Sequence, residues 1–201
     1  MTRPDPIPTA ASNPFATCWT RPGALPFLPT DQASVDHCLA VLRGNGMRGK
    51  IVGPHGAGKS TLLRALQASL EEAGVPTAWL RGGRDAAPAT AAQFRGRVCL
   101  IDSFEELGRW RRRQWRRHPW GVVVTTHGRD RLPALAELRP TLADIERCFG
   151  LLTQDRSTPV TRTDLRNAFA RHEGNVREVW FDLYDRHEQR QRNLNPSAAG
   201  A

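Results

Sequence analysis

Short apolar runs alternate with amphipathic stretches through the middle of this chain. Residues 98–102 begin with four apolar side chains in a row, as expected of a strand that is buried on both faces of a sheet. Residues 60–73 instead place leucines at helical spacing, and Gly74 is a typical helix end. Strands are expected over residues 50–52, 75–80, 98–102 and 121–126, and helices over 31–43, 60–73 and 104–117. Strands that alternate with helices predict an α/β fold with a parallel sheet flanked by helices.

The pattern changes after Pro140. Helical periodicity continues through three segments, and no clear strand follows. The expected helices cover residues 141–153, 161–171 and 175–190. The fifth strand of the sheet is poorly marked, and residues 138–142 are its only candidate. The sequence therefore predicts a small all-helical subdomain after the α/β core.

Prolines and changes in composition indicate the domain organisation. Prolines crowd the first 30 residues, so an extended leader is expected there, and apolar side chains such as Phe15 and Phe27 indicate that it packs on the rest of the protein. A helix capped by Asp31 follows the leader. The expected divisions are a leader with its helix at 1–45, the core at 46–142, the helical subdomain at 143–192 and a flexible tail at 193–201.

A glycine-rich loop follows the first expected strand and opens the first helix of the core. It reads Gly53-Pro54-His55-Gly56-Ala57-Gly58-Lys59-Ser60, with Thr61 next. This matches G-x-x-x-x-G-K-[ST], a pattern whose glycines let backbone N–H groups point at phosphate oxygens. Lys59 is expected to reach the β- and γ-phosphates, Ser60 to take one position on Mg²⁺, and Thr61 to lie near the α-phosphate.

With this loop the chain resembles the P-loop NTPases, from about residue 48 to residue 142. The resemblance implies a nucleoside triphosphate site for ATP and Mg²⁺ in which all of residues 53–61 contribute to binding. The choice between ATP and GTP stays open.

A P-loop enzyme needs an acidic residue at the end of a neighbouring strand to hold the water shell of the metal. Asp102 ends the run at 98–102 and is the candidate, with capping of the next helix as the alternative. Many ATPases place Glu directly after this Asp to activate water, but Ser103 follows here. Glu105 is the candidate general base, and a surface charge is the alternative. Slow hydrolysis, or nucleotide binding without efficient turnover, therefore stays open.

Polar residues also end the fourth strand. Related NTPases place a residue here that senses the γ-phosphate. Thr126 is the first candidate for this role, followed by Thr125 and His127, and an ordinary turn is the alternative.

The last helix opens with Glu173-Gly174-Asn175-Val176-Arg177-Glu178. Gly-Asn-Val-Arg-Glu resembles the second sensor of the AAA+ ATPases, especially the bacterial transcription activators of that class. The resemblance implies that Arg177 projects from a helical lid onto the bound nucleotide, and a surface arginine is the alternative. Three helices after the sheet fit such a lid, although the module is short for that family.

The excess of basic residues points to one further candidate surface, at residues 109–117. The chain has 29 basic and 20 acidic residues, a formal charge of +9, and its only lysines are Lys50 and Lys59. Coding bias toward arginine is one explanation of this excess, and recognition of phosphate or nucleic acid is the other. Arginines and tryptophans are interleaved over residues 109–117. This segment is either a solvated helix whose Phe104, Leu107 and Trp115 pack on the sheet, a site for single-stranded nucleic acid, or a surface for an acidic protein or neighbouring subunit. Candidates for an arginine finger are Arg129, Arg131 and Arg139.

Several classes of protein are excluded. No apolar run approaches the 18 residues of a membrane-spanning helix, and no apolar segment typical of a secretory signal follows the first residues. The four cysteines are scattered, without the paired spacing of zinc or redox sites. The expected compartment is therefore the cytoplasm, with reduced thiols and no membrane partner.

The leading hypothesis is a small AAA+-like ATPase that hydrolyses ATP with Mg²⁺ and signals its nucleotide state to a partner. The second is a nucleotide-dependent switch or nucleic-acid-associated adaptor with weak hydrolysis. A third is a small-molecule kinase that uses residues 81–96 around its acceptor. The signature Leu-Ser-Gly-Gly-Gln of ABC-type ATPases is absent. Assembly into oligomers stays open.

Overall fold

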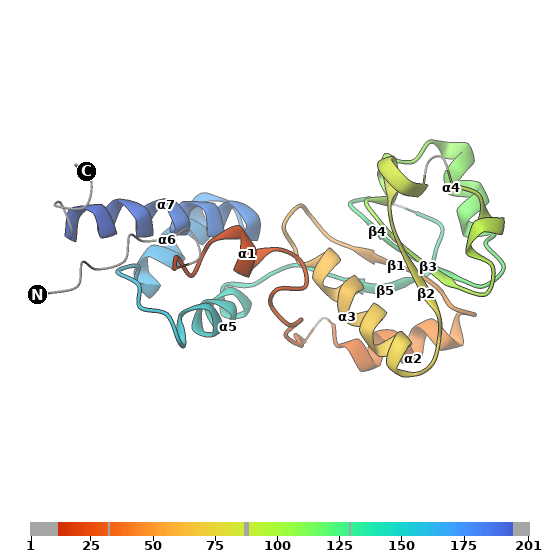
Figure 1. The fold of residues 1–201 in the computed structure, drawn as a ribbon, viewed down its shortest axis with the longest axis horizontal. Coiled ribbons are helices and arrows are strands. Elements are labelled where there is room, and N and C mark those ends of the chain that lie inside the picture. The colour runs from red at the N-terminus through yellow and green to blue at the C-terminus, as the bar shows by residue number, and fades with distance from the viewer. Residues whose placement is uncertain (1–11, 32, 87–88, 129, 195–201) are drawn as a thin grey trace, which may run out of the picture. The chain divides into compact units, whose positions relative to one another are not determined.

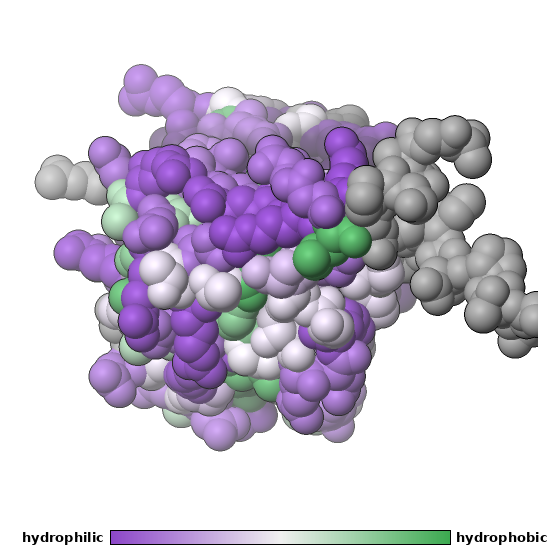
Figure 2. Space-filling model, turned by 90° about the vertical axis from the view of Figure 1, so that its left-hand side faces the viewer, coloured by the Kyte–Doolittle hydropathy of each residue, from purple (hydrophilic) through white to green (hydrophobic). Residues whose placement is uncertain are grey.

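A computed structural model of the chain describes residues 12–31, 33–86, 89–128 and 130–194. The chain folds into two compact units (Figure 1). Pro26–Arg139 form the sheet unit, and the described residues before Pro26 (12–25) together with those after Arg139 (140–194) form the helical unit. No helix of the described ranges is both long and apolar enough to cross a membrane. Figure 2 shows one face of the molecule, on which hydrophilic side chains predominate and hydrophobic ones are scattered.

The sheet unit contains a five-stranded, entirely parallel sheet in the part of the chain that the structure describes. Its strands are β1 (Arg48–Val52), β2 (Thr77–Arg81), β3 (Val98–Asp102), β4 (Val122–Thr126) and β5 (Ala134–Glu137). The strand order is β2-β3-β4-β1-β5, so β4 lies between β1 and β3. This confirms the predicted α/β class, and four of the strands overlap the predicted runs.

The fifth strand is earlier than expected. Residues 138–142 contain Pro140, which has no N–H to donate to a neighbouring strand, so that segment is unsuited to the sheet. The strand is instead Ala134–Glu137, whose Leu135 and Ala136 are buried against the sheet core. A run of only two buried apolar residues is too short to stand out in the sequence.

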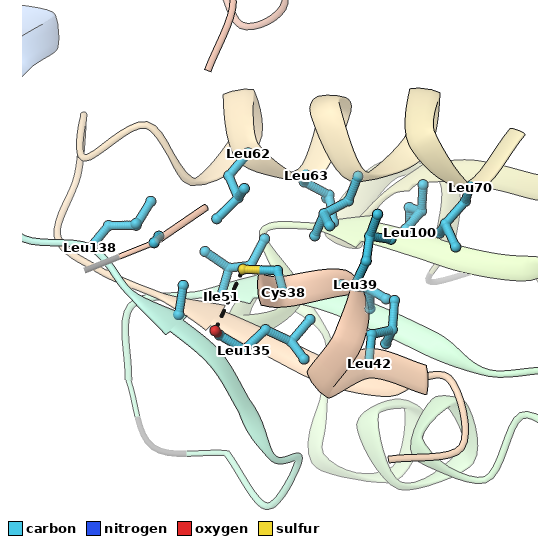
Figure 3. Packing of buried hydrophobic residues seen from close by; sticks show 14 of the residues in the cluster. Cys38, Leu39, Leu42, Ile51, Leu62, Leu63, Leu70, Leu100, Leu135 and Leu138 are labelled. Atoms are coloured by element: carbon cyan, nitrogen blue, oxygen red, sulfur yellow. Dashed lines mark hydrogen bonds between the residues drawn. The ribbon is translucent and has the colours of Figure 1, made fainter. Parts of the chain in front are cut away.

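One face of the sheet is covered by α2 (Val35–Gly44) and α3 (Lys59–Glu72) (Figure 1). The four leucines predicted to lie on one face of α3 are all fully buried: Leu62, Leu63, Leu66 and Leu70. Figure 3 shows Leu62, Leu63 and Leu70 near the side chains of α2, where Cys38 Sγ lies 3.5 Å from the Leu135 carbonyl oxygen. The cap of α2 differs from the prediction, because Ser34 rather than Asp31 accepts the His37 N–H at 3.2 Å.

The other face packs against a π-helical turn at Gly82–Ala86, a 3₁₀ turn at Ala91–Phe94 and α4 (Arg109–Arg116). The single helix predicted over 104–117 is wrong. Phe104–Glu106 form a separate 3₁₀ turn, Leu107 is extended, and Gly108 precedes α4 without a side-chain cap. Phe104, Leu107 and Trp115 are nevertheless buried in one cluster, as predicted, because the break turns both segments toward the sheet.

The helical unit contains α1 (Thr17–Thr20), α5 (Leu142–Thr153), α6 (Arg162–Arg171) and α7 (Val176–Leu194). The last three match the predicted helices. The described part of the leader is not simply extended: Phe15 is buried among these helices, with its ring 5.6 Å from that of Phe149 and 6.2 Å from that of Trp180. Residues 12–25 thus belong to the helical unit, with Phe15 in its core. Residues 1–11 and 195–201, which include most of the predicted tail, lie outside the described residues.

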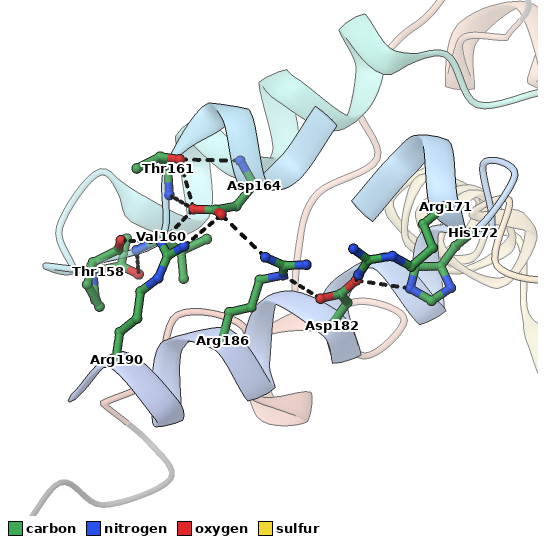
Figure 4. A network of polar contacts seen from close by, with 10 residues as sticks. Thr158, Val160, Thr161, Asp164, Arg171, His172, Asp182, Arg186 and Arg190 are labelled. Carbon is green, nitrogen blue, oxygen red and sulfur yellow. Dashed lines mark hydrogen bonds and ion pairs between the residues drawn. The ribbon is translucent and has the colours of Figure 1, made fainter. Parts of the chain in front are cut away.

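A polar network joins α6 to α7 (Figure 4). Asp164 closes the first turn of α6 on Thr161 and accepts two hydrogen bonds from Arg190, at 2.6 and 2.8 Å. These bonds, led by that from Arg190, hold the pKa of the Asp164 carboxyl well below its ordinary value. Nearer the start of α7, Asp182 accepts hydrogen bonds from Arg186 and Arg171, each at 2.6 Å.

Asp164→Asn is expected to destabilise the helical unit by about 1–3 kcal/mol at pH 7, because it leaves Arg190 without a charged partner. The folded pKa lies below the unfolded one, so the carboxylate stabilises the fold above about pH 4 and this contribution is lost as the pH falls further. Urea unfolding followed by circular dichroism at pH 7 and about pH 2.5 measures both effects.

Asp144→Asn is the matched control, because Asp144 occupies the same capping position on α5 and its nearest cation, Arg147, is 3.9 Å away. Equal losses for the two variants at pH 7, or a difference between them that does not narrow from pH 7 to about pH 2.5, contradict this account.

Candidate functional site

Most of the predicted site residues meet at one edge of the sheet. The glycine-rich loop (residues 53–60) follows β1, Asp102 ends β3, and Thr126 ends β4. All strands are parallel and β4 lies between β1 and β3, so these three chain segments emerge side by side. The carboxyl edge of an open parallel sheet is where such folds bind ligands.

The loop geometry depends on its glycines. Gly56 and Gly58 have φ values of 72° and 85°, in the left-handed region that side chains other than glycine disfavour. At Gly53 a Cβ atom would lie 2.7 Å from the Leu138 carbonyl oxygen. Gly58 precedes α3 and supplies no side-chain cap, so the first N–H groups of that helix face the loop with the positive end of the helix dipole.

Lys59 is folded back onto the loop. Its side chain is buried, and its Nζ donates to the carbonyl oxygens of Gly53 at 2.8 Å and Pro54 at 2.6 Å. The same Nζ lies 3.2 Å from Nδ1 of His127. The ammonium group is therefore held where the loop's own carbonyls surround it, and it must leave at least part of this shell to bind an anion.

Asp102 connects the loop helix to β4. Ser60 Oγ lies 2.9 Å from each carboxylate oxygen of Asp102, and Thr125 Oγ1 donates to one of them at 2.6 Å. Thr125 Oγ1 also accepts a hydrogen bond from the N–H of Ser103 at 2.9 Å. Ser103 itself has a φ of 60°, in the left-handed region. The carboxylate is thus fixed by hydroxyl groups from two different elements.

Glu105 and His127 form a second pair beside the first. Glu105 Oε1 lies 3.1 Å from Nε2 of His127. Burial, reinforced by the nearby Lys59, lowers the pKa of His127 below its ordinary value, so the imidazole is neutral at pH 7. Nδ1 also lies 3.0 Å from the Gly53 carbonyl oxygen, to which it donates in one tautomer. In the other tautomer the proton is on Nε2, which donates to Glu105, and Nδ1 accepts from Lys59. Glu105, His127 and Lys59 then form one continuous chain of hydrogen bonds.

The polar residues after β4 have different neighbours from those expected. Thr126, the first candidate for a sensor, is buried and accepts the N–H of Gly128 at 3.3 Å. Thr125 contacts Asp102, and His127 reaches Lys59 and packs on His55, with ring centroids 3.7 Å apart. In the sequence, Thr125 is only the first of two threonines that follow three valines, and nothing there marks it rather than Thr126 as the partner of Asp102.

The remaining loop residues are more open. Pro54 and His55 are exposed, and Thr61 in the first turn of α3 is partly buried. Ala57 is buried and has no side-chain chemistry to offer beyond its backbone. The predicted contacts of these residues with phosphate stay predictions.

The predicted arginines belong to different parts of the chain. Arg177 is exposed in the first turn of α7, in the helical unit, and its assignment to a nucleotide stays a prediction. Among the finger candidates, Arg139 pairs with Glu137 at 2.6 Å, Arg131 is exposed, and Arg129 lies outside the described residues.

The donors fit Mg²⁺ better than a metal that needs a protein cage. No group of three or more His, Cys, Asp or Glu side chains within the described ranges could hold a metal ion. Mg²⁺ typically keeps several waters and takes one or two protein oxygens together with substrate phosphates. Ser60 and Asp102 offer that set, since their oxygens lie 2.9 Å apart at the start of α3.

Comparison with models of known protein families and with curated proteins found no match for this chain.

Thr125→Val is expected to destabilise the sheet unit by about 1–3 kcal/mol. The change keeps the side-chain volume but leaves the Ser103 N–H without its acceptor and removes a donor from Asp102. Thr125→Ser retains the hydroxyl and is the control. Urea unfolding at pH 7 compares the two, and a valine variant as stable as the serine variant would show that Thr125 does not fix this corner.

Proposed function

We propose that this chain binds ATP with Mg²⁺ at the carboxyl edge of the sheet and hydrolyses it, as a small AAA+-like ATPase. The observation that carries the proposal is the pairing of Ser60 with Asp102. A hydroxyl at the start of a helix and a carboxylate at the end of a strand 42 residues later meet at 2.9 Å. They do so directly after a loop that matches the phosphate-binding pattern.

Each group has a distinct part in this proposal. Backbone N–H groups of residues 55–60 bind phosphate oxygens, and Lys59 moves from the Gly53 and Pro54 carbonyls to the β- and γ-phosphates. Ser60 and Asp102 would hold Mg²⁺. When bound, Mg²⁺ neutralises charge on the β- and γ-phosphates.

Water activation falls to Glu105 in this proposal, because Ser103 occupies the usual position. Glu105 Oε2 is buried and has no hydrogen-bond partner among the described residues, while Oε1 faces His127. The free oxygen accepts a proton from water as the water oxygen bonds to the γ-phosphorus and the bond to the bridging oxygen breaks. ADP leaves with the electron pair of that bond.

A second candidate, a nucleotide-dependent switch with weak hydrolysis, is favoured by the same contacts. His127 bonds to Glu105 at 3.1 Å and lies 3.2 Å from Lys59, so one side chain ties up both groups. Binding a triphosphate would draw Lys59 away and change the partner of His127. The γ-phosphate is then sensed at His127 or at the neighbouring Thr126, and Arg177 of the helical unit passes the nucleotide state to a partner.

Lys59→Ala is expected to weaken ATP·Mg²⁺ binding roughly 10- to 100-fold, because a charge-assisted contact to phosphate is lost. Isothermal titration calorimetry measures the dissociation constant. Lys50→Ala removes the same charge from β1, where the amine donates to the Asp130 carbonyl at 2.7 Å, and should change affinity less than about twofold. Unchanged affinity in the Lys59 variant would falsify the phosphate-site assignment.

Glu105→Gln is expected to lower steady-state phosphate release roughly 100-fold or more while ATP affinity stays the same, because the amide cannot take up the proton. Glu106→Gln is the control, since Glu106 turns away to accept the Gly83 N–H at 3.0 Å. A native protein that binds ATP but releases no phosphate supports the switch. Phosphate release that is normal in the Glu105 variant means that another group activates water.

A further inference from the structure

The outer face of α4 carries an unusual surface. Arg109, Trp110, Arg113 and Arg117, called here the α4 stripe, are all exposed, and the Trp110 side chain keeps 69% of its accessible surface. Successive residues of a helix are rotated by roughly 100°, so these four positions fall within one quarter to one third of the helix circumference. Trp115 lies on the opposite side and is 1% exposed, which anchors the helix to the sheet core.

Two other arginines of this segment have structural partners, whereas the buried Nε of Arg112 has no hydrogen-bond partner among the described residues. Arg111 donates to the Ala89 carbonyl and to Gln114, and Arg116 pairs with Asp130. Arg109, Arg113 and Arg117 form no ion pair with any described residue, and the sequence from Leu107 to Gly121 contains no Asp or Glu. The positive charge of the stripe is therefore uncompensated within the described parts of the protein.

Three like charges spaced four residues apart also oppose helix formation. Each such pair costs about 0.2–0.5 kcal/mol in an isolated helix. Coding bias accounts for arginine instead of lysine, but it does not explain why the charges align on the one face that the core leaves open. A polyanion bound along the helix would relieve this repulsion.

We propose that the α4 stripe binds single-stranded nucleic acid. The arginines recur about every 6 Å along the helix axis and their planar guanidinium groups can each hold a phosphate with two parallel hydrogen bonds. The Arg111 guanidinium lies over the Trp110 ring, 5.1 Å from its centroid, and the residue still keeps 69% of its accessible surface, so the indole retains an open face on which a base can stack.

Trp110 is what favours nucleic acid over an acidic protein. Carboxylates need only the arginines, whereas a base needs both a cation for its phosphate and an aromatic surface for its ring. Duplex DNA keeps its bases stacked inside the helix, so an exposed indole gains little from it. The inference does not require ATP hydrolysis, because the stripe lies on α4 and is separate from Lys59, Ser60 and Asp102.

The test is fluorescence anisotropy with a labelled 20-nucleotide oligothymidine and the full chain, without ATP. Trp110→Ala should weaken binding roughly 5- to 100-fold, and Trp110→Phe should retain most of it. Changing Arg109, Arg113 and Arg117 together to alanine should weaken binding at least 10-fold and flatten the slope of log K against log salt by about 2.

The matched control changes three exposed arginines elsewhere, Arg43, Arg95 and Arg162, to alanine, which removes the same net charge. Circular dichroism verifies that every variant is folded. The inference is overturned if the control triple loses as much affinity as the α4 triple, or if duplex DNA binds as tightly as the single strand. It is also overturned if polyglutamate competes equally with the oligonucleotide and Trp110→Ala has no effect, a result that identifies the stripe as a surface for acidic proteins.

Discussion

The carboxylate of Asp102 is the constraint on which the functional edge of this protein depends. It receives hydroxyl contacts from Ser60 at the start of α3 and from Thr125 near the end of β4, at 2.6–2.9 Å. The loop after β1 and the ends of β3 and β4 are thereby joined at a single side chain. A polar group that links three elements of a buried sheet holds them in one arrangement, because losing any one bond leaves another group unsatisfied. In the proposed ATPase this same carboxylate faces Mg²⁺.

The neighbouring hydrogen-bonded residues Glu105, His127 and Lys59 are the part of this edge that a bound phosphate would rearrange. Lys59 is already satisfied by the loop carbonyls and His127, so a bound phosphate has to replace contacts that exist. Any anion that binds there must exceed those contacts in strength, and a triphosphate with its concentrated charge is suited to this. The proposed function therefore couples nucleotide binding to a change around Glu105, whether or not efficient hydrolysis follows.

The proposed nucleic-acid surface begins only a few residues beyond the same carboxylate. Residues 103–108 connect Asp102 to α4. Phe104 in this connection and Trp115 in α4 are buried in the same hydrophobic cluster. The arginine excess of the sequence thus has several uses: Arg111, Arg116 and Arg190 serve the fold, while Arg109, Arg113 and Arg117 face outward.

Local patterns in the sequence determined most of the secondary structure and the loop at 53–60. The spacing of the leucines in α3 and the apolar run at 98–102 depends only on which faces of the helix and the strand are buried. The loop pattern is also local, because it requires glycines in left-handed conformations within a stretch of eight residues. The sequence did not reveal β5 at Ala134–Glu137, the break at Leu107 and Gly108, or the place of Phe15 in the helical core. The pairing of Asp102 with Thr125 and of His127 with Lys59 was equally hidden. These depend on contacts between segments far apart in the chain, and only the tertiary structure decided which strands became neighbours and hence which polar side chains meet.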